Sequence, residues 1–300
     1  MSRAVVWLRP VFAAIAIALS GAMPAVAADR CATDALDRNV CLPAPARRVV
    51  SLSPGATELL YSAGAGDAVV AASAWSDYPP PARDLPRVGD ANRLDLEAIV
   101  AARPDLIVAW TDGNSRSQLE RLSDLGLTVF WLTPRTFDDI ARAVVDLGQL
   151  TGHDALARDR ANRFLAGLAA LRDRYRNARP VRVFYQIWDE PLMTVNRDEL
   201  ISKSLALCGA VNVFADADRL VPRVSRESVL LARPEAILTA APETDAERAL
   251  AAWRAFPDLP AVAHDNLLVL PPDRLQRPTL RMLDGARDLC LRLEAARGRL

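Results

Sequence analysis

One stretch of this 300-residue chain occurs twice, and this repetition constrains the fold more than any other feature. The first copy is LDLEAIVAARPDLIVAW at 94–110, and the second is VSRESVLLARPEAILTA at 224–240. Glu97 aligns with Glu227, and the offset of 130 residues holds without a gap. Solenoid repeats recur every 20–50 residues or so, which excludes that architecture here. A single recurrence at this distance predicts one helix-to-strand unit used once in each of two similar lobes.

Each copy is typical of a short helix followed by a buried strand. Apolar residues of the first copy recur at the i, i+3 and i+4 spacing of one helix face, at Leu96, Ile99 and Val100. Arg103-Pro104 predicts the end of this helix, because proline disfavours the helical conformation in the residue before it. The apolar run at 106–109 is what a strand buried on both faces of a parallel sheet requires.

Glu97 and Glu227 occupy the same position in the two copies, near the start of each predicted helix. The helix macrodipole favours a carboxylate there, which explains either residue taken alone. Their equivalent placement in two lobes also favours a shared role, and we treat both as candidate functional residues.

Strand and helix patterns alternate through both halves of the chain, which predicts an α/β fold with parallel sheets. We expect two Rossmann-like lobes with central parallel sheets, one over 47–152 and one over 180–300, bridged by a linking helix at 153–179. Ser53 and Pro54 predict a capped start for the first helix. The sequence further predicts an irregular lead-in at 29–46, a loop at 188–191, one helix over 247–256 and a last helix over 279–296.

The linking helix is the longest regular segment that the sequence predicts. Residues 154–178 contain no proline and one glycine, and their apolar stripe runs through Ala161, Phe164, Leu165, Leu168, Leu171 and Tyr175. At about 1.5 Å per residue, such a helix is roughly 36 Å long, enough to run along a whole lobe. We expect a rigid linker that restrains hinge motion between the lobes.

The first 28 residues have the pattern of a secretory signal peptide. Arg3 and Arg9 give a positive start, 11–19 is apolar, and Ala25-Val26-Ala27 is a small-residue cleavage site. The apolar run is too short to span a bilayer. We therefore expect a soluble, exported protein.

The chain offers little material for catalysis or nucleic-acid binding. Its formal net charge is +0 at pH 7, so no basic surface for nucleic acid is expected. His153 and His264 are the only histidines, and the GxSxG, Gly-rich phosphate-loop and HExxH motifs are absent. We expect a binding protein with no cofactor, no metal site and no catalytic residue. A periplasmic hydrolase that uses one of the two histidines is the alternative from another class.

Four cysteines follow the predicted signal peptide, an even number that favours disulfides in an exported protein. They allow three connectivities. We favour Cys31–Cys41 as a local clip and Cys208–Cys290 as a long-range bridge within the second half. The spacings resemble neither a zinc site nor a CxxC redox pair.

Large aromatic residues follow several of the predicted strands. Ligands of open parallel sheets bind outside the carboxyl ends of the strands, so residues at these ends are candidates for ligand contact. The candidates, in chain order, are Pro54, Gly55, Trp75, Trp110, Trp188, Asp273 and Arg277. Indole rings from both halves, with few polar groups among them, suit a flat and partly apolar ligand held between two lobes.

Six motifs, in order from about residue 47 to the C-terminus, carry a family resemblance. They are RVVSLSPGATELLYSAG, the SDYPP loop, LEAIVAARPDLIVAW, VFYQIWDEPLMTV, CGAVNVF and VSRESVLLARPEAIL. Together they resemble the periplasmic vitamin B12-binding proteins of cobalamin ABC importers, which are class III substrate-binding proteins. The first and third motifs are shared with iron-siderophore and haem binders, whereas the SDYPP loop and Trp110 are more particular to cobalamin binders. Ala91 stands where some relatives carry tryptophan, Trp75 stands in place of a tyrosine, and the loop at 273–277 lacks the aromatic residues of some relatives.

The resemblance implies two lobes bridged by one long helix, in a protein that acts as a monomer. It implies that Glu97 and Glu227 dock onto arginines of the importer's membrane subunits. It further implies a Cys208–Cys290 disulfide, and corrinoid contacts from Trp75, Trp110, the Trp188 region and the loop at 273–277.

We therefore expect a periplasmic substrate-binding protein that captures a corrinoid in a cleft between its lobes and delivers it to an inner-membrane ABC importer. Capture is expected to occur in a largely preformed cleft, and docking then moves the lobes apart. A haem or ferric-siderophore binder is the alternative within the class.

Overall fold

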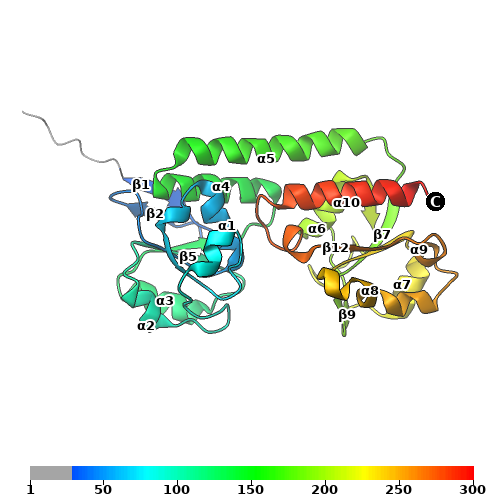
Figure 1. Ribbon diagram of the computed structural model, residues 1–300, viewed down its shortest axis with the longest axis horizontal. Coiled ribbons are helices and arrows are strands. Elements are labelled where there is room, and N and C mark those ends of the chain that lie inside the picture. Colours follow the sequence, from blue (N-terminus) through cyan, green and yellow to red (C-terminus); the bar gives the residue numbers. More distant parts are fainter. Residues whose placement is uncertain (1–28) are drawn as a thin grey trace, which may run out of the picture.

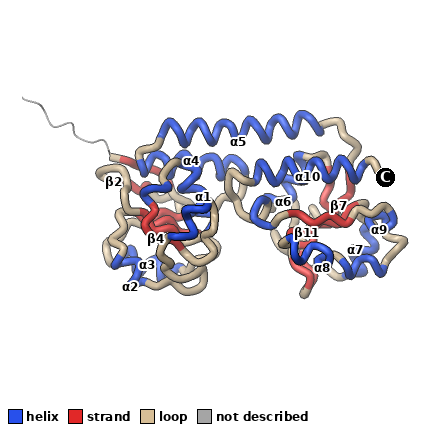
Figure 2. Tube along the Cα trace, in the orientation of Figure 1, coloured by secondary structure: helices blue, strands red, loops and turns tan. Residues whose placement is uncertain are grey.

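The computed structural model describes residues 29–300, so the expected signal peptide over 1–28 lies outside the described part of the chain. Two α/β lobes lie side by side, and helix α5 (Asp154–Tyr175) runs along both of them (Figure 1). Each lobe contains a four-stranded parallel sheet with helices around it (Figure 2). The predicted fold class, two parallel-sheet lobes bridged by one long helix, is confirmed.

The sheet of the first lobe has the strand order β4-β3-β5-β6, and all neighbouring strands are parallel. Ser53 caps the first helix by accepting a hydrogen bond from the backbone N–H of Ala56, and Pro54 is the first helical residue, as predicted. The strands are β3 (Val49–Ser51), β4 (Val69–Ala72), β5 (Leu106–Trp110) and β6 (Val129–Leu132). The helices are α1 (Pro54–Ala63), α2 (Leu96–Ala101), α3 (Arg116–Asp124) and α4 (Phe137–Thr151), with 3-10 turns at Gly66–Ala68 and Pro80–Asp84.

The sheet of the second lobe has the strand order β10-β7-β11-β12, again with all neighbours parallel. The strands are β7 (Val181–Gln186), β10 (Ala210–Asn212), β11 (Ala236–Ala240) and β12 (Leu267–Leu270). The helices are α6 (Leu200–Leu207), α7 (Arg226–Ala232), α8 (Ala246–Ala249), α9 (Pro260–Ala263) and α10 (Met282–Arg297). The 3-10 turns are Glu243–Asp245, Ala251–Ala255 and Pro272–Arg274.

The two lobes have the same topology. In each sheet, the second strand of the lobe lies at one edge, next to the first, which is followed by the third and fourth. The repeated sequence unit supplies α2 and β5 in one lobe and α7 and β11 in the other, so the predicted helix-to-strand unit is confirmed. The arginine of each Arg-Pro pair adopts the left-handed conformation, with φ of 47° at Arg103 and 44° at Arg233.

The acidic residue after each Arg-Pro pair anchors the first strand of its lobe. The Asp105 carboxylate accepts hydrogen bonds from the backbone N–H groups of Arg47 (2.8 Å) and Arg48 (3.0 Å). The Glu235 carboxylate accepts one from the backbone N–H of Arg182 (2.9 Å). These N–H groups lie at strand starts, where an unpaired donor would be costly. The repeated stretch therefore makes the same contact in both lobes.

Helix α5 packs through the apolar stripe that the sequence predicts. Ala161, Phe164, Leu168 and Tyr175 are buried, and Leu165 and Leu171 pack against the core clusters at their margins. Helices α4 and α10 lie nearly end to end beneath α5 (Figure 1). The three helices together form a spine along one side of both lobes.

The hydrophobic core is continuous from one lobe to the other through this spine. The cluster that contains α1, α4 and α5 side chains of the first lobe also contains Met282 and Ala286 of α10 and Leu200 of α6. Gly167 permits the close approach of α5 and α10, because a Cβ at this position would lie 2.5 Å from a methyl group of Leu283. A shared, close-packed core of this kind restrains large movement of one lobe against the other.

The lead-in at 29–46 is not irregular, contrary to the sequence-based prediction. It forms an antiparallel hairpin of β1 (Arg30–Thr33) and β2 (Asn39–Leu42). The Asp34 carboxylate closes the turn by accepting hydrogen bonds from the N–H groups of Leu36 and Arg38. The hairpin also bonds to the edge strand β6, since the N–H of Ala35 donates to the carbonyl of Trp131. Strands of four residues give too short an alternation to identify without these partners.

Three other boundaries differ from the sequence-based prediction because of tertiary contacts. The loop expected at 188–191 begins a small hairpin of β8 (Trp188–Asp189) and β9 (Leu192–Met193). The helix expected over 247–256 breaks near Leu250, since Leu250 and Trp253 are both drawn into a core cluster with Phe184. The last helix begins at Met282, not Thr279, whose hydroxyl is bonded to Glu58.

The four cysteines form two disulfides, Cys31–Cys41 and Cys208–Cys290. The first joins the paired strands β1 and β2, and the second joins the end of α6 to α10. Within residues 29–300, no helix has both the length and the apolar character needed to cross a bilayer. The same residues include no cluster of three or more His, Cys, Asp or Glu side chains placed to hold a metal ion.

Candidate functional site

Two connected hollows lie between the lobes, near the carboxyl end of β5. The first, of about 220 Å³, lies between the start of α1 and the loop before α10. Its lining includes Pro54, Gly55 and Trp110 from the first lobe, and Gln276 and Arg277 from the second. The second, of about 290 Å³, shares Trp110, Pro134, Gln276 and Pro278 with the first.

A third hollow, of about 490 Å³, continues from Gln276 into the second lobe. It lies at the carboxyl ends of β7 and β11, and Trp188 forms part of its wall. We refer to the three hollows together as the interlobe cleft. This position agrees with the general rule that ligands of open parallel sheets bind beyond the carboxyl ends of the strands.

The indole of Trp110 projects into the cleft from the last residue of β5. Its backbone N–H donates to the side-chain oxygen of Asn114 (2.8 Å), whose amide nitrogen donates in turn to the carbonyl of Leu52 (3.0 Å). Any Cβ at position 113 would lie 2.0 Å from the Trp110 ring, so the Asp112-Gly113 turn requires glycine. Trp110 is 39% exposed, which leaves ring surface available to a ligand.

Two other tryptophans are more exposed than Trp110. Trp188 is 60% exposed in the third hollow, and its indole N–H donates to the carbonyl of Glu190 (2.9 Å). Trp75 is 78% exposed and adopts a left-handed conformation with φ of 66°. Trp75 and Asp273 are not among the described residues that line the three hollows, although the Trp75 loop contacts the cleft wall through Asp77.

A buried carboxylate links the two lobes beside the first hollow. Glu58 of α1 is 2% exposed and accepts hydrogen bonds from Arg277 (3.0 Å), Arg281 (3.1 Å) and the Thr279 hydroxyl (3.0 Å). The Arg277 guanidinium also donates to the Asp77 carboxylate (2.8 Å). We call these five residues the Glu58 cluster. Its acids belong to the first lobe and its donors to the second, so it fixes the lobes against each other at the cleft wall.

The two acids of the Glu58 cluster respond differently to burial. Burial raises the pKa of Glu58 above its ordinary value, and the hydrogen bond from Arg277 and the charge of Arg281 offset only part of this effect. Burial also acts to raise the pKa of Asp77, but the hydrogen bond and charge of Arg277, a backbone hydrogen bond and the charge of Arg83 together outweigh it and leave the pKa below its ordinary value. The same acids raise the pKa of Arg277 despite its own burial.

The model of the periplasmic binding protein family matches residues 49–274 of this chain. The chain belongs to this family. It is 39% identical over 258 residues to the vitamin B12-binding protein of Vibrio cholerae, covering 85% of this chain and 91% of that protein. It is 38% identical over 250 residues to the vitamin B12-binding protein of Yersinia pestis, covering 83% and 87%. These relatives are named as binding proteins, not as enzymes.

Solved structures of the family share the fold described above. The periplasmic vitamin B12-binding protein of Vibrio cholerae superposes with a TM-score of 0.76 at 38% identity, over 84% of this chain and 98% of that one. The periplasmic heme-binding protein of Roseiflexus sp. RS-1 superposes with a TM-score of 0.74 at 23% identity, over 83% and 98%. At this lower identity the second likeness is one of fold alone.

The structure brings together some of the predicted site residues of this periplasmic binding protein and separates others. Pro54, Gly55, Trp110 and Arg277 line one hollow, whereas Trp188 lines another that opens from the same cleft. Sequence reasoning missed Glu58, because a glutamate on a helix usually lies in water. The sequence does contain a signal that Glu58 is buried, because its neighbours in the helix are mostly apolar. These neighbours are Ala56, Thr57, Leu59 and Leu60, and all four are buried.

Glu97 and Glu227 lie far from the cleft, in the first turns of α2 and α7. Both side chains are exposed, and both helices lie on the side of the molecule opposite α5 (Figure 1). A hydrogen bond from its own backbone N–H, and a second from the Ser225 hydroxyl, lower the pKa of Glu227 and keep it charged. The two carboxylates thus lie at equivalent places on the tips of the two lobes.

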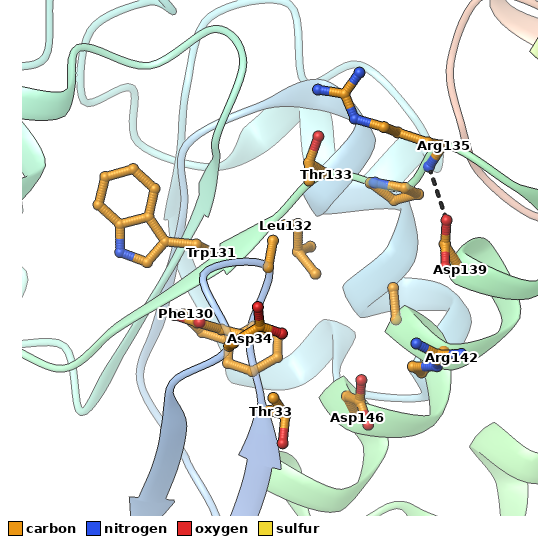
Figure 3. Close-up of a pocket in the computed structure, with 14 residues that line it drawn as sticks. Thr33, Asp34, Phe130, Trp131, Leu132, Thr133, Arg135, Asp139, Arg142 and Asp146 are labelled. Atoms are coloured by element: carbon orange, nitrogen blue, oxygen red, sulfur yellow. Dashed lines mark hydrogen bonds between the residues drawn. The ribbon is translucent and has the colours of Figure 1, made fainter. Parts of the chain in front are cut away.

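A separate hollow of about 230 Å³ lies within the first lobe, away from the cleft. Figure 3 shows its walls, which come from the β1–β2 hairpin, β6 and α4. Asp146 of α4 faces this hollow beside Arg142, and burial raises its pKa to about 6, while Arg142 lowers it only partly. No residue of the second lobe is among the described residues that line it, so we assign no ligand role to this hollow.

The raised pKa of Asp146 predicts a pH-dependent gain in stability for Asp146→Asn. The pKa in the folded state, about 6, lies above the value of 3.8 for a free carboxyl, so the contribution of Asp146 is fully favourable below pH 4 and is lost as pH rises through 6. The Asn variant should be more stable than the parent by about 1 kcal/mol at pH 7, after allowance for partial exposure. Urea unfolding should show this difference vanish toward pH 4. Asp173→Asn, a change at an exposed position on α5, should show no such trend.

Proposed function

We propose that this protein captures a corrinoid of the vitamin B12 type in the interlobe cleft and delivers it to an inner-membrane ABC importer. The main support for this proposal is a cleft with walls from both lobes and with the Trp110 indole at the end of β5. The chain that forms this cleft is 39% identical to a vitamin B12-binding protein. A corrinoid is large, flat and apolar on its faces, which suits contact with Trp110 and Trp188. The protein performs no chemistry on it.

In this proposal, ligand contacts come from Pro54, Gly55, Trp110, Trp188 and Arg277 in the walls of the cleft. Trp75 and Asp273 complete the set from the rim. Trp75 belongs here because its exposed ring lies in the loop that Asp77 ties to Arg277. An exposed indole beside a cleft is typical of a side chain that stacks on an incoming ring.

Capture occurs with little lobe movement, because the spine of α4, α5 and α10 shares one core across the lobes. Two polar links add to this restraint. One is the Glu58 cluster, and the other joins the ammonium of Lys203 to the carbonyl of Arg135 (2.8 Å) in the opposite lobe. Docking of Glu97 and Glu227 onto arginines of the importer's membrane subunits then moves the lobes apart and releases the ligand.

The protein works in the periplasm as a monomer, after export through the signal peptide at 1–28. Its functional units are a lobe over 47–152, the linking helix at 153–179 and a lobe over 180–300. A haem or ferric siderophore is the second candidate ligand, supported only by the likeness of fold to a heme-binding protein. The hydrolase alternative has no support in the cleft, since His153 lies at the start of α5 and His264 at the end of α9.

Replacing Trp110 tests the assigned cleft. Trp110→Ala is expected to weaken cyanocobalamin binding by roughly ten- to a hundredfold, since loss of one buried aromatic contact at a binding site costs about 1–3 kcal/mol. Fluorescence titration of the purified protein measures this change. Leu291→Ala removes an exposed apolar side chain from α10, outside the cleft, and should bind as the parent does. Unaltered binding by Trp110→Ala would place the ligand elsewhere.

A further inference from the structure

Among the described residues that line the first hollow, the one cationic side chain, Arg277, is already neutralised by three carboxylates. Arg277 donates to Glu58 (3.0 Å) and Asp77 (2.8 Å), and lies 3.2 Å from the Asp273 carboxylate. Only 20% of its side chain is exposed, so these acids cover most of the guanidinium. Because each contact is a charge-assisted hydrogen bond or a close ion pair, Arg277 has little charge left to offer a ligand.

Two of the other three cations that line the cleft are also held by oxygen acceptors. The Arg135 guanidinium pairs with Asp112 at 3.0 Å, and the Lys203 ammonium donates to the backbone carbonyls of Asp198 and Arg135. Among the described residues that line the three hollows, four carry positive charge and five carry carboxylates. Around Arg277, Glu58, Asp77 and Asp273 add three negative charges, and Arg281 adds one positive charge. The cleft is therefore acidic, although the whole chain is formally neutral.

We propose that the interlobe cleft selects for ligands without net negative charge, and that Glu58 establishes this selectivity by holding and neutralising Arg277. This inference rests on the proposed function of the cleft. Glu58 is the decisive acid because it is 2% exposed. An anionic ligand that drew Arg277 away would leave this carboxylate buried and deprived of one of its two guanidinium partners, at a large desolvation cost. Asp77 and Asp273, which are half-exposed, can return to water when they lose Arg277.

This arrangement separates two classes of flat macrocycle that fit a cleft of the same shape. A corrinoid carries its peripheral side chains as neutral amides, which can donate to carboxylates and accept from guanidinium groups. Haem carries two propionates, and their negative charges would face the acids of the cleft. Repulsion of the wrong ligand, in addition to attraction of the right one, is a general source of specificity.

A pair of ligands that differ in one charge tests the inference directly. Cyanocobalamin and its monocarboxylate, in which one peripheral amide is hydrolysed to an acid, have nearly the same shape. The parent protein is expected to bind the monocarboxylate more weakly by on the order of tenfold, as one unit charge about 10 Å away implies at an effective dielectric of about 20. Calorimetric titration with both ligands at low and high salt gives this ratio, which should shrink as salt is added.

Changing the acids of the Glu58 cluster should reduce the ratio of the affinity for cyanocobalamin to the affinity for its monocarboxylate. Glu58→Gln removes the buried one of the three acids that neutralise Arg277 and is expected to bring the two affinities to within about threefold of each other. Asp77→Asn keeps the buried carboxylate and should act in the same direction more weakly, so it serves if Glu58→Gln does not fold. Asp159→Asn on α5 makes the same change in net charge outside the cleft and should retain the parental ratio.

The outcomes distinguish this inference from the proposed function. Equal affinity of the parent protein for cyanocobalamin and its monocarboxylate would overturn the charge selectivity and leave corrinoid capture intact. An unchanged ratio in both Glu58→Gln and Asp77→Asn would overturn the role of Glu58. Tighter binding of haem than of cyanocobalamin would overturn both proposals, since haem is the anion that the cleft should exclude.

Discussion

Reversing both proposed docking charges, in the double variant Glu97→Arg and Glu227→Arg, is expected to reduce importer-dependent uptake of labelled corrinoid to the background level. The two carboxylates are exposed, occupy equivalent helix starts and lie on the same side of the two lobes (Figure 1). If each pairs with an arginine of the importer, reversal replaces two attractions by two repulsions. Because one lobe remains attached in each single variant, either reversal alone should cause only part of the loss.

Corrinoid affinity must be measured in the same double variant, and it should equal that of the parent protein. Neither glutamate lines the cleft, so a change in affinity would point to misfolding, not to lost docking. Glu294→Arg gives the matched control for each single variant, since it makes one charge reversal at an exposed position on α10. Uptake that is unaffected by the double reversal would refute the docking assignment.

Removing the Cys208–Cys290 disulfide is expected to cost about 4 kcal/mol of unfolding free energy. The two cysteines are 82 residues apart, and a cross-link that closes so long a loop strongly restricts the unfolded chain. Both side chains are fully buried between α6 and α10, so their replacement also loosens the core of the second lobe. Thermal unfolding of the Cys208→Ala and Cys290→Ala double variant should show a melting temperature roughly 10 °C lower.

The second disulfide of the same chain supplies the comparison. Cys31 and Cys41 are only 10 residues apart, so the chain-entropy term alone predicts a smaller loss of about 3 kcal/mol when both are changed to alanine. This pair also lies in a hairpin outside the two sheets, and its loss should leave ligand affinity unchanged. A larger loss from the hairpin pair than from Cys208–Cys290 would contradict the argument that the longer closed loop gives the larger stabilisation.

The elements that the sequence predicts well are those whose signals are local. The repeated unit combines helical spacing, an Arg-Pro stop and an apolar strand within 17 residues, and both copies fold as predicted. Helix α5 is equally clear, because its stripe from Ala161 to Tyr175 has helical spacing over about four turns. The capped start of α1 follows from Ser53 and Pro54 alone. In each case the determining residues are close neighbours in the chain.

The parts that the sequence does not reveal depend on contacts between distant segments. Glu58 and Arg281 are 223 residues apart, and only the folded chain brings them to 3.1 Å. The β1–β2 hairpin depends on a bond to β6, and the break near Leu250 depends on the burial of Trp253 against Phe184. Trp75 shows the limit for a site residue, since its strand-end position predicts ligand contact but not its exposed, left-handed conformation.

Direct titration of the purified mature protein with cyanocobalamin tests the central claim, with haem and a ferric siderophore as parallel ligands. Calorimetry should show saturable binding of one cyanocobalamin per chain with a dissociation constant at or below about 1 μM, equivalent to roughly 8 kcal/mol. Quenching of tryptophan fluorescence should follow the same curve, since Trp110 and Trp188 lie in the cleft. Weak or no cyanocobalamin binding, with tight binding of haem or the siderophore, would contradict the account and reassign the ligand.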